Sequence, residues 1–385
     1  MTPEDSPTPE DFLLQLLGTG ALPGLPEPVD RVPELVELHG LEGLAVARGR
    51  EEGSASLPGE LRTRWEPAYR ARGLESVVVL EAAARAREAL AGRGMASLLF
   101  KGAALVADGT YPDPGARRMD DADLLVRPED APAAVEALME SGFEPVGDWG
   151  GERVRWADAL TLRDREAPAG TLPVLDLHWR TGYDRLRFGE DGAASVLWND
   201  VDPAAGIPAP GPHLVVVAEH LLKHLRFRVH LAAYGDLARM ATSVGDWEGV
   251  EAMVEASRLE RGLRSLLLVL AREMGAPVPE TLLRDASGRL GTDLSPRTLA
   301  GTRRVAGHRL SGLLLRGRLV GSPRAVLADL REAVLPSGSW LRARYGTGVL
   351  RGWIRYLVDL VRWATYRGRS PASPNQELFH PTARE

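Results

Sequence analysis

Residues 121–126 place two charged side chains in what otherwise reads as a buried strand. Because side chains along a strand alternate between its faces, Asp121 and Asp123 point to one face and the small and apolar residues 122, 124 and 126 point to the other. The two carboxylates then lie about 6.5 Å apart along the strand. Two like charges this close raise at least one carboxyl pKa, whereas Mg²⁺ takes its ligands from carboxylates and substrate phosphates. The strand therefore predicts a metal site.

The segment before this strand has the features of a phosphate site. Residues 97–100 form a short apolar strand that ends at Lys101 and Gly102, and we expect a brief helix over residues 103–107. Free backbone N–H groups at a helix start, beside a glycine without a side chain, bind phosphate. Lys101 adds a point charge there, or is simply a solvated strand end. Lys101 and Lys223 are the only lysines among 47 basic residues, which suggests a preference for a compact ammonium at both positions.

A third carboxylate lies on a later strand, which we expect over residues 172–180. Alternation places Asp176, His178 and Arg180 on one face and the apolar residues between them on the other. His178 either orients a carboxylate or contacts a substrate, or it is a core histidine whose hydrogen bonds are satisfied. Asp121, Asp123 and Asp176 are thus the three candidate metal ligands.

The remaining polar candidates have structural explanations of equal or greater weight. Arg117 and Arg118 either neutralise phosphate charge or pair with nearby aspartates, and we expect Asp120 to be the structural partner of one of them. His220 and His224 flank Lys223 at the helical spacing of a zinc pair, but no glutamate lies between them and no third ligand is apparent. We therefore interpret these histidines as structural or interface residues.

Composition excludes several classes of function. The 385-residue chain is 44% hydrophobic and 26% charged, as in ordinary globular proteins. Its net charge of −6 argues against duplex DNA as a partner. It has no cysteine, so any metal must be held by oxygen or histidine. The N-terminus lacks the basic and apolar segments of a secretory signal, and no apolar run approaches the roughly 20 residues of a membrane span. We therefore expect a cytoplasmic protein without a membrane partner.

Periodicity predicts an α+β protein with a small mixed sheet, flanking helices and an all-helical C-terminal part. The expected domains are an N-terminal helical cap (1–74), the sheet core (75–210), a helical C-terminal domain (211–368) and a disordered tail (369–385). Residues 203–212 are rich in proline and glycine and mark the second boundary. The expected helices cover 9–17, 32–48, 61–92, 128–141, 214–225, 230–240, 247–257, 261–274, 279–289, 296–306, 323–334 and 349–366, and further strands cover 143–146 and 154–162.

The order of these motifs resembles the DNA polymerase β-like nucleotidyltransferase superfamily, and within it a bacterial branch described as an uncharacterised nucleotidyltransferase family. The resemblance rests on a glycine motif after a first strand, then an Asp-x-Asp strand, then a lone aspartate on a later apolar strand. The matching segments are residues 99–105, 111–112, 117–130, 142–143 and 175–179, with weaker echoes at 220, 234–237, 335–336 and 344–345.

The resemblance implies roles for these residues. Asp121 and Asp123 would hold two Mg²⁺ (or Mn²⁺) ions, and Asp176 would ligate the ion that lowers the pKa of the attacking hydroxyl. Gly102 would let the backbone approach the triphosphate. Lys101, Arg118, His178 and Lys223 are the further candidate nucleotide contacts. The chain departs from the superfamily at Gly102-Ala103, where Gly-Ser or Gly-Gly is usual, and in its longer spacing from Gly102 to Asp121.

The expected activity is transfer of a nucleotidyl group from an NTP, such as ATP, to a hydroxyl or phosphate. The acceptor is left open among small molecules, peptides and proteins. One alternative keeps the fold and metals but moves a sugar or phosphoryl group from another activated donor, as the altered glycine motif allows. Another is a nucleotide-binding module without turnover, such as a sensor or a toxin–antitoxin partner.

Overall fold

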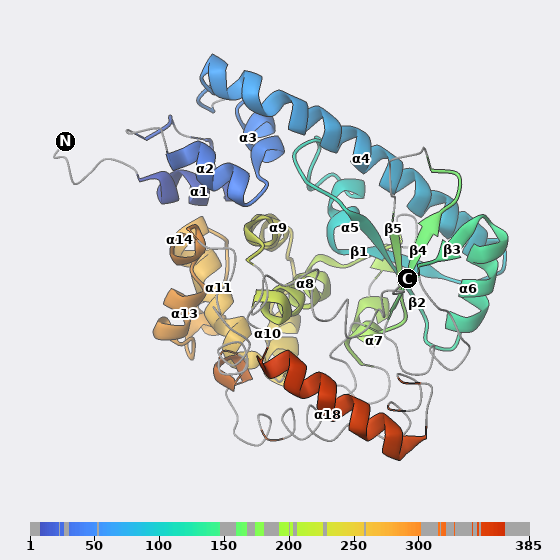
Figure 1. Ribbon diagram of the computed structural model, residues 1–385. Helices are drawn as coiled ribbons and strands as arrows, with labels where there is room; N and C mark the ends of the chain where they lie inside the picture. Colours follow the sequence, from blue (N-terminus) through green and yellow to red (C-terminus); the bar gives the residue numbers. More distant parts are fainter. Residues whose placement is uncertain are drawn as a thin grey trace.

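The protein is an α+β structure in which one mixed sheet lies beside a large group of helices (Figure 1). The computed structural model describes residues 8–22, 24–26, 31–51, 54–146, 159–167, 174–180, 192–199, 201–202, 206–225, 229–257, 259–301 and 348–365, and residues 315, 317–320, 327, 341 and 345. The fold class expected from the sequence is thereby confirmed.

The sheet has five strands in the order β1-β2-β5-β4-β3. Their bounds are β1 Ser97–Phe100, β2 Asp121–Val126, β3 Phe143–Pro145, β4 Ala159–Asp164 and β5 Val174–His178. Strands β2 and β5 are parallel, and the other neighbouring pairs are antiparallel. The sheet is therefore mixed, as expected. The start of the strand expected at 154–162 lies outside the described residues.

The two faces of the sheet differ in what covers them. Ala122, Leu124 and Val126 join a core with α4 (Gly59–Ala91) and α6 (Ala131–Glu140). On the other face, Leu125 packs with Leu197 of α7 (Gly192–Asn199) and with α8 (Pro210–Leu225). The alternation predicted for the aspartate strand is confirmed, and the acidic side chains share the face of α7 and α8.

Helix α4 connects two hydrophobic cores. Its first turns place Trp65 in the helical core, and its later turns place Val79 and Leu90 in the core on the sheet. Its 33 residues run along one side of the molecule (Figure 1). The single long helix predicted over residues 61–92 is confirmed.

The helical core joins the N-terminal helices to helices that follow the sheet in the sequence. Helix α1 (Pro9–Leu17) packs against α9 (Leu231–Thr242) and α11 (Glu260–Met274). Other helices of this region are α2 (Arg31–Leu38), α3 (Glu42–Arg48), α10 (Trp247–Ala256), α12 (Glu280–Leu283), α13 (Gly288–Leu294) and α14 (Pro296–Leu299). The N-terminal helices therefore share a core with the later helices. The domain boundaries drawn from the sequence stay a prediction.

Several expected helices differ from the structure. Helix α6 begins at Ala131 instead of residue 128, α8 begins at Pro210 instead of residue 214, and α14 ends at Leu299, with residues 300 and 301 in a turn. The helix expected over residues 32–48 is two helices, because the chain turns at Gly40, where the backbone φ is +66°. The helix expected over 279–289 is also divided, and Ser287 caps the second part by accepting a hydrogen bond from the Leu290 N–H. The short helix after β1, α5 (Lys101–Ala107), begins at Lys101, two residues earlier than expected.

The last described helix, α18 (Val349–Thr365), was expected from the sequence. The part of the helix expected at 296–306 beyond residue 301, the helix expected at 323–334 except residue 327, and the tail from 369 lie outside the described residues. In the described part of the chain, no helix has the length and apolar character needed to cross a membrane.

Replacing Leu124 with Ala tests the core beneath the acidic strand. Leu124 is fully buried, so the substitution leaves a cavity and should lower the free energy of unfolding by about 2–5 kcal/mol. Urea denaturation measures this change. Leu74→Ala is the matched control, because Leu74 is 71% exposed and its truncation should cost less than about 0.5 kcal/mol. Equal losses in both variants would contradict the assigned core.

Candidate functional site

Two aspartates face each other across the parallel pair of strands. In the register of β2 and β5, Asp123 lies directly opposite Asp176. Both side chains are on the sheet face covered by α7 and α8, because each follows the alternation that sends its apolar neighbours to the other core. The sheet thus brings together two carboxylates that are 53 residues apart in the sequence.

Asp123 is the most tightly held of the three candidate aspartates. Its Oδ1 accepts a hydrogen bond from Lys101 Nζ at 2.5 Å and another from His178 Nε2 at 2.8 Å. The Asp123 side chain is only 8% exposed. Burial by itself would raise its carboxyl pKa, but Lys101 and His178 outweigh burial and lower the pKa below its usual range. Asp123 is therefore ionised, and Lys101 is its part-buried ion-pair partner instead of a solvated strand end.

Asp176, Asp123 and His178 together can hold one cation. The Thr161 hydroxyl of β4 donates to Asp176 Oδ1 at 2.6 Å and orients that carboxylate. Each of the three side chains offers one ligand atom, and these atoms all lie within 4.8 Å of one another. Two carboxylate oxygens and one imidazole nitrogen suit a divalent ion such as Mn²⁺, and the carboxylates suit Mg²⁺. The donor set fits a divalent cation, and the identity of the metal and the ligand role of Asp121 stay predictions.

Asp121 lies on the same strand face but outside this group of three. Burial, and then repulsion from Asp123 and Asp176, raise the pKa of Asp121 to about 8. Asp121 is thus close enough to interact electrostatically with both. Its expected role as a ligand stays a prediction.

Lys101 has an unusual backbone conformation, with φ at +53°. Few residues other than glycine adopt this left-handed region, so the surrounding structure must hold it. The Lys101 N–H donates to Nε2 of His213, at the start of α8, over 2.7 Å. Burial lowers the pKa of His213 to about 4, so the imidazole is neutral and its Nε2 can accept. Helix α8 therefore fixes the lysine that reaches Asp123.

A second buried contact joins the site to α9. Asp236 accepts hydrogen bonds from Arg117 Nε at 3.0 Å, from Arg117 Nη2 at 2.9 Å and from the Tyr111 hydroxyl at 2.9 Å. Burial alone would lower the pKa of Arg117, but Asp236 raises it above its usual value. A Cβ at Gly102 would overlap the Arg117 guanidinium. In this structure, the close approach that requires glycine at position 102 is made by Arg117.

The other candidates from the sequence are placed elsewhere. Arg118 Nε donates to Asp120 at 2.8 Å, which confirms the expected structural pairing of Asp120. Lys223 belongs to α8, and its side chain lies outside the described residues. The rings of His220 and His224 are 4.4 Å apart, and neither belongs to the candidate metal group found among the described residues. The nucleotide contacts expected of Arg118 and Lys223 stay predictions.

Sequence reasoning missed four residues that shape the site: His213, Asp236, Tyr111 and Thr161. Tyr111 and Asp236 belong to short segments that carried the family resemblance, which was the available signal for them. His213 directly follows the proline-rich stretch interpreted as a boundary, and Thr161 looks like any polar residue of an exposed strand face. Nothing in the sequence shows that these residues meet the aspartate strand.

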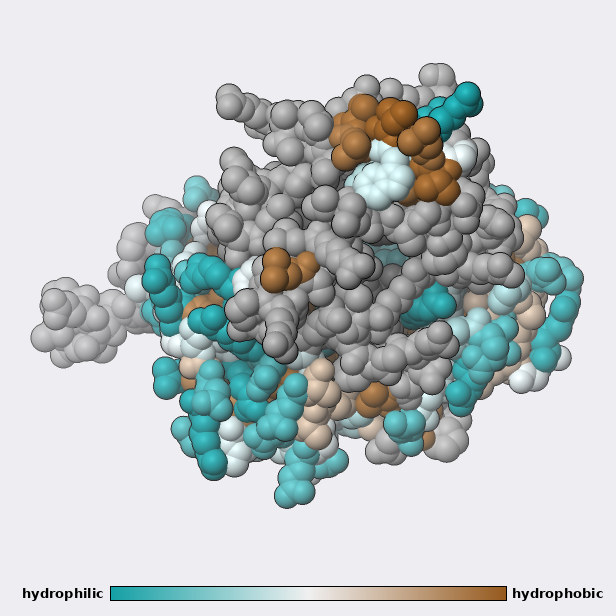
Figure 2. Space-filling model, turned by 90° about the horizontal axis from the view of Figure 1, so that it is seen from below, coloured by the Kyte–Doolittle hydropathy of each residue, from teal (hydrophilic) through white to brown (hydrophobic). Residues whose placement is uncertain are grey.

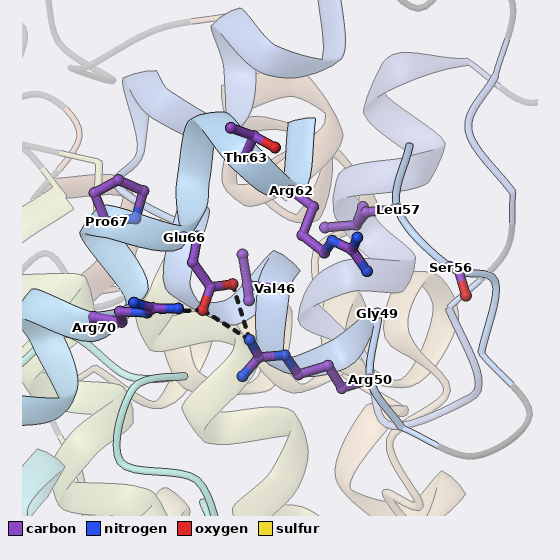
Figure 3. Close-up of a pocket in the computed structure, with 10 residues that line it drawn as sticks. All are labelled: Val46, Gly49, Arg50, Ser56, Leu57, Arg62, Thr63, Glu66, Pro67 and Arg70. Atoms are coloured by element: carbon purple, nitrogen blue, oxygen red, sulfur yellow. Dashed lines mark hydrogen bonds and ion pairs between the residues drawn. The ribbon is translucent and has the colours of Figure 1, made fainter. Parts of the chain in front are cut away.

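A separate cavity of about 650 Å³ lies between α3 and the start of α4 (Figure 3). Glu66 points into it and accepts hydrogen bonds from Arg50 Nη2 at 2.8 Å and Arg70 Nε at 3.0 Å. The lining residues are Val46, Gly49, Arg50, Ser56, Leu57, Arg62, Thr63, Glu66, Pro67 and Arg70. None of the aspartates of the sheet lines this cavity.

A mixed sheet that places two aspartates and a histidine around one point defines a candidate metal-dependent centre. The chain belongs to the uncharacterised nucleotidyltransferase family, whose family model matches residues 26–275. No curated protein and no solved structure matches the chain. The family part of the resemblance is confirmed, and the superfamily stays a prediction.

Asp121→Asn should change how stability depends on pH when no metal is present. The folded-state pKa of Asp121, about 8, is above the unfolded value of about 4, so its stabilising contribution is present below pH 4 and is lost as the pH rises through 8. Above pH 8 the variant should be more stable than the wild type by about 1–3 kcal/mol. Urea denaturation in EDTA measures the difference. Asp120→Asn is the control, and a pH profile that follows the wild type in both variants would contradict this account.

Gly102→Ala should destabilise the protein because its Cβ would displace the Arg117 guanidinium from Asp236. We expect a loss of about 1–3 kcal/mol, the usual cost of overpacking. Gly288→Ala is the matched control, since a Cβ there meets nothing within 4 Å. Denaturation curves of the two variants give the comparison. If Gly102→Ala is as stable as Gly288→Ala, then Arg117 does not occupy the space above Gly102.

Proposed function

We propose that this protein transfers a nucleotidyl group from an NTP to a hydroxyl or phosphate of an acceptor, with release of pyrophosphate. The observation that carries the proposal is the register that pairs Asp123 with Asp176, beside His178, on one face of the sheet. Membership of a nucleotidyltransferase family supports the reaction class. We also propose that the chain belongs to the DNA polymerase β-like superfamily. The metal would be Mg²⁺ or Mn²⁺, and ATP would be one of the donors.

Asp123, Asp176 and His178 would hold the metal, and Asp121 would complete a two-ion centre. When bound, such ions supply charge neutralisation at the phosphates and lower the pKa of the attacking hydroxyl. The pKa of Asp121, raised by its acidic neighbours, fits a carboxyl that gains from a nearby cation.

The residues around the aspartates would neutralise the charge of the NTP phosphates and hold the aspartates in position. Lys101 carries the ammonium that lies against Asp123, and its Nζ is also 5.0 Å from the centre of the Phe100 ring. We propose that this ammonium contacts the phosphates of the bound NTP. Without a metal, His178 Nε2 donates to Asp123 and orients it, and the Thr161 hydroxyl orients Asp176. His213 keeps the Lys101 backbone in place through its hydrogen bond. These contacts would reduce the reorganisation needed when charge develops on the phosphates.

The decisive experiment measures whether the protein transfers a nucleotidyl group, and from which NTP. The wild-type protein is incubated with Mg²⁺ or Mn²⁺, each NTP in turn and a mixture of hydroxyl and phosphate acceptors. Pyrophosphate release and mass spectrometry of the acceptors then report transfer. Asp123→Asn and Asp176→Asn should each lower the rate by about 10²-fold or more, because positioned charge stabilisation is lost. Asp120→Asn, a surface aspartate paired with Arg118, should keep the wild-type rate.

Parallel incubations with nucleotide sugars test the main alternative donor. Transfer of a sugar without pyrophosphate release would replace the nucleotidyl proposal while keeping the site. NTP binding by calorimetry without any product would assign a binding module. Full NTP turnover in both Asp123→Asn and Asp176→Asn would contradict the assigned site.

A further inference from the structure

Helix α18 turns an apolar stripe toward solvent. Leu350, Ile354, Leu357 and Val358 follow one another at helical spacing and lie on one face, with exposed fractions of 76%, 57%, 48% and 44%. Figure 2 shows hydrophobic residues gathered in one patch over this helix. Other exposed apolar side chains of the described residues, such as Met139, occur singly or as a pair. An apolar patch of this kind marks an interaction surface.

The stripe is exposed because the helix packs through a different side. Tyr356 is 91% buried, and a Cβ at Gly352 would lie 3.0 Å from the Leu341 Cβ. A globular helix normally turns its apolar stripe to the core and its polar side to solvent. Here the stripe is left outside while Tyr356 and Gly352 face the protein. The apolar residues of the stripe are therefore available to a partner.

Charge along the helix favours an anionic partner. Arg351 and Arg355 are exposed, and each directly follows a residue of the stripe. Over residues 349–358, the part of α18 whose side chains the structure describes, these two arginines stand without any acidic residue. A second copy of the helix packed against this stripe would bring like charges together, which costs free energy. Self-association is thus disfavoured relative to a negatively charged surface.

We propose that α18 lies on an anionic lipid surface, with the stripe in the headgroup and acyl boundary and the arginines among the headgroups. A strong apolar face, an arginine-bearing border and an aromatic residue such as Trp353 are the features of interfacial helices. A convex helix face also enters a fluid lipid surface without a matching groove. The helix lies on the membrane and does not cross it. The proposal is independent of the reaction assigned to the acidic site.

Vesicle flotation of the full-length protein tests the proposal. Vesicles of phosphatidylcholine mixed with phosphatidylglycerol should bind the wild type, and vesicles of phosphatidylcholine alone should bind it at least about fivefold more weakly. The double variant Leu350→Glu/Leu357→Glu should lower the partition coefficient on anionic vesicles by about tenfold or more. Leu74→Glu is the matched control, because Leu74 is a leucine of α4 that is 71% exposed, and its substitution should leave binding unchanged.

A second double variant tests how much the arginines of α18 contribute to vesicle binding. Arg351→Glu/Arg355→Glu should abolish the preference for anionic vesicles, whereas Arg62→Glu, which changes an exposed arginine of α4, should retain it. Unfolding curves establish that each variant is folded. Wild-type protein that does not float with anionic vesicles overturns the proposal. A dimer in light scattering that Leu350→Glu/Leu357→Glu dissociates also overturns it, and assigns the stripe to a second copy of the chain.

Discussion

The ion pair between Lys101 and Asp123 is the contact on which the site depends. Burial disfavours a charged carboxylate, so Asp123 can stay ionised inside the sheet only because an ammonium and an imidazole donate to the same oxygen. Removing either donor leaves a buried charge without full compensation, which is costly. The same arrangement keeps an ionised acid next to Asp176. These contacts thereby keep a polar centre on one face of a five-stranded sheet whose other face is hydrophobic.

The helical part of the molecule contributes to this centre from a distance in sequence. His213 of α8 and Asp236 of α9 reach the two segments that flank the aspartate strand, one through the Lys101 backbone and the other through Arg117. Both contacts are part-buried, and movement of either helix would change the position of a charged group beside the aspartates. The helices are therefore part of the site as well as a neighbouring scaffold.

The sequence was sufficient for the features that follow from local periodicity. Alternation along residues 121–126 correctly separated acidic and apolar faces, and the long helical pattern of 61–92 appears as α4. The sequence was not sufficient where packing between distant segments determines the end of a helix or the role of a side chain. The break at Gly40 depends on a positive φ that glycine permits but does not require, and the role of His213 depends on a contact over 112 residues. Likewise, the sequence does not show that the Arg117 guanidinium occupies the space above Gly102, and the phosphate role expected for Gly102 stays a prediction.

The core that α1 shares with α9 and α11 determines when the chain can fold during its synthesis. Helix α1 leaves the ribosome more than two hundred residues before its partners α9 and α11 are complete. Until then the apolar side of α1, which includes Phe12 and Leu16, can be covered only in part, by α2 and α3, while the sheet can assemble earlier. Such a chain closes its largest core last, and during that interval its N-terminal helices are candidates for protection by chaperones.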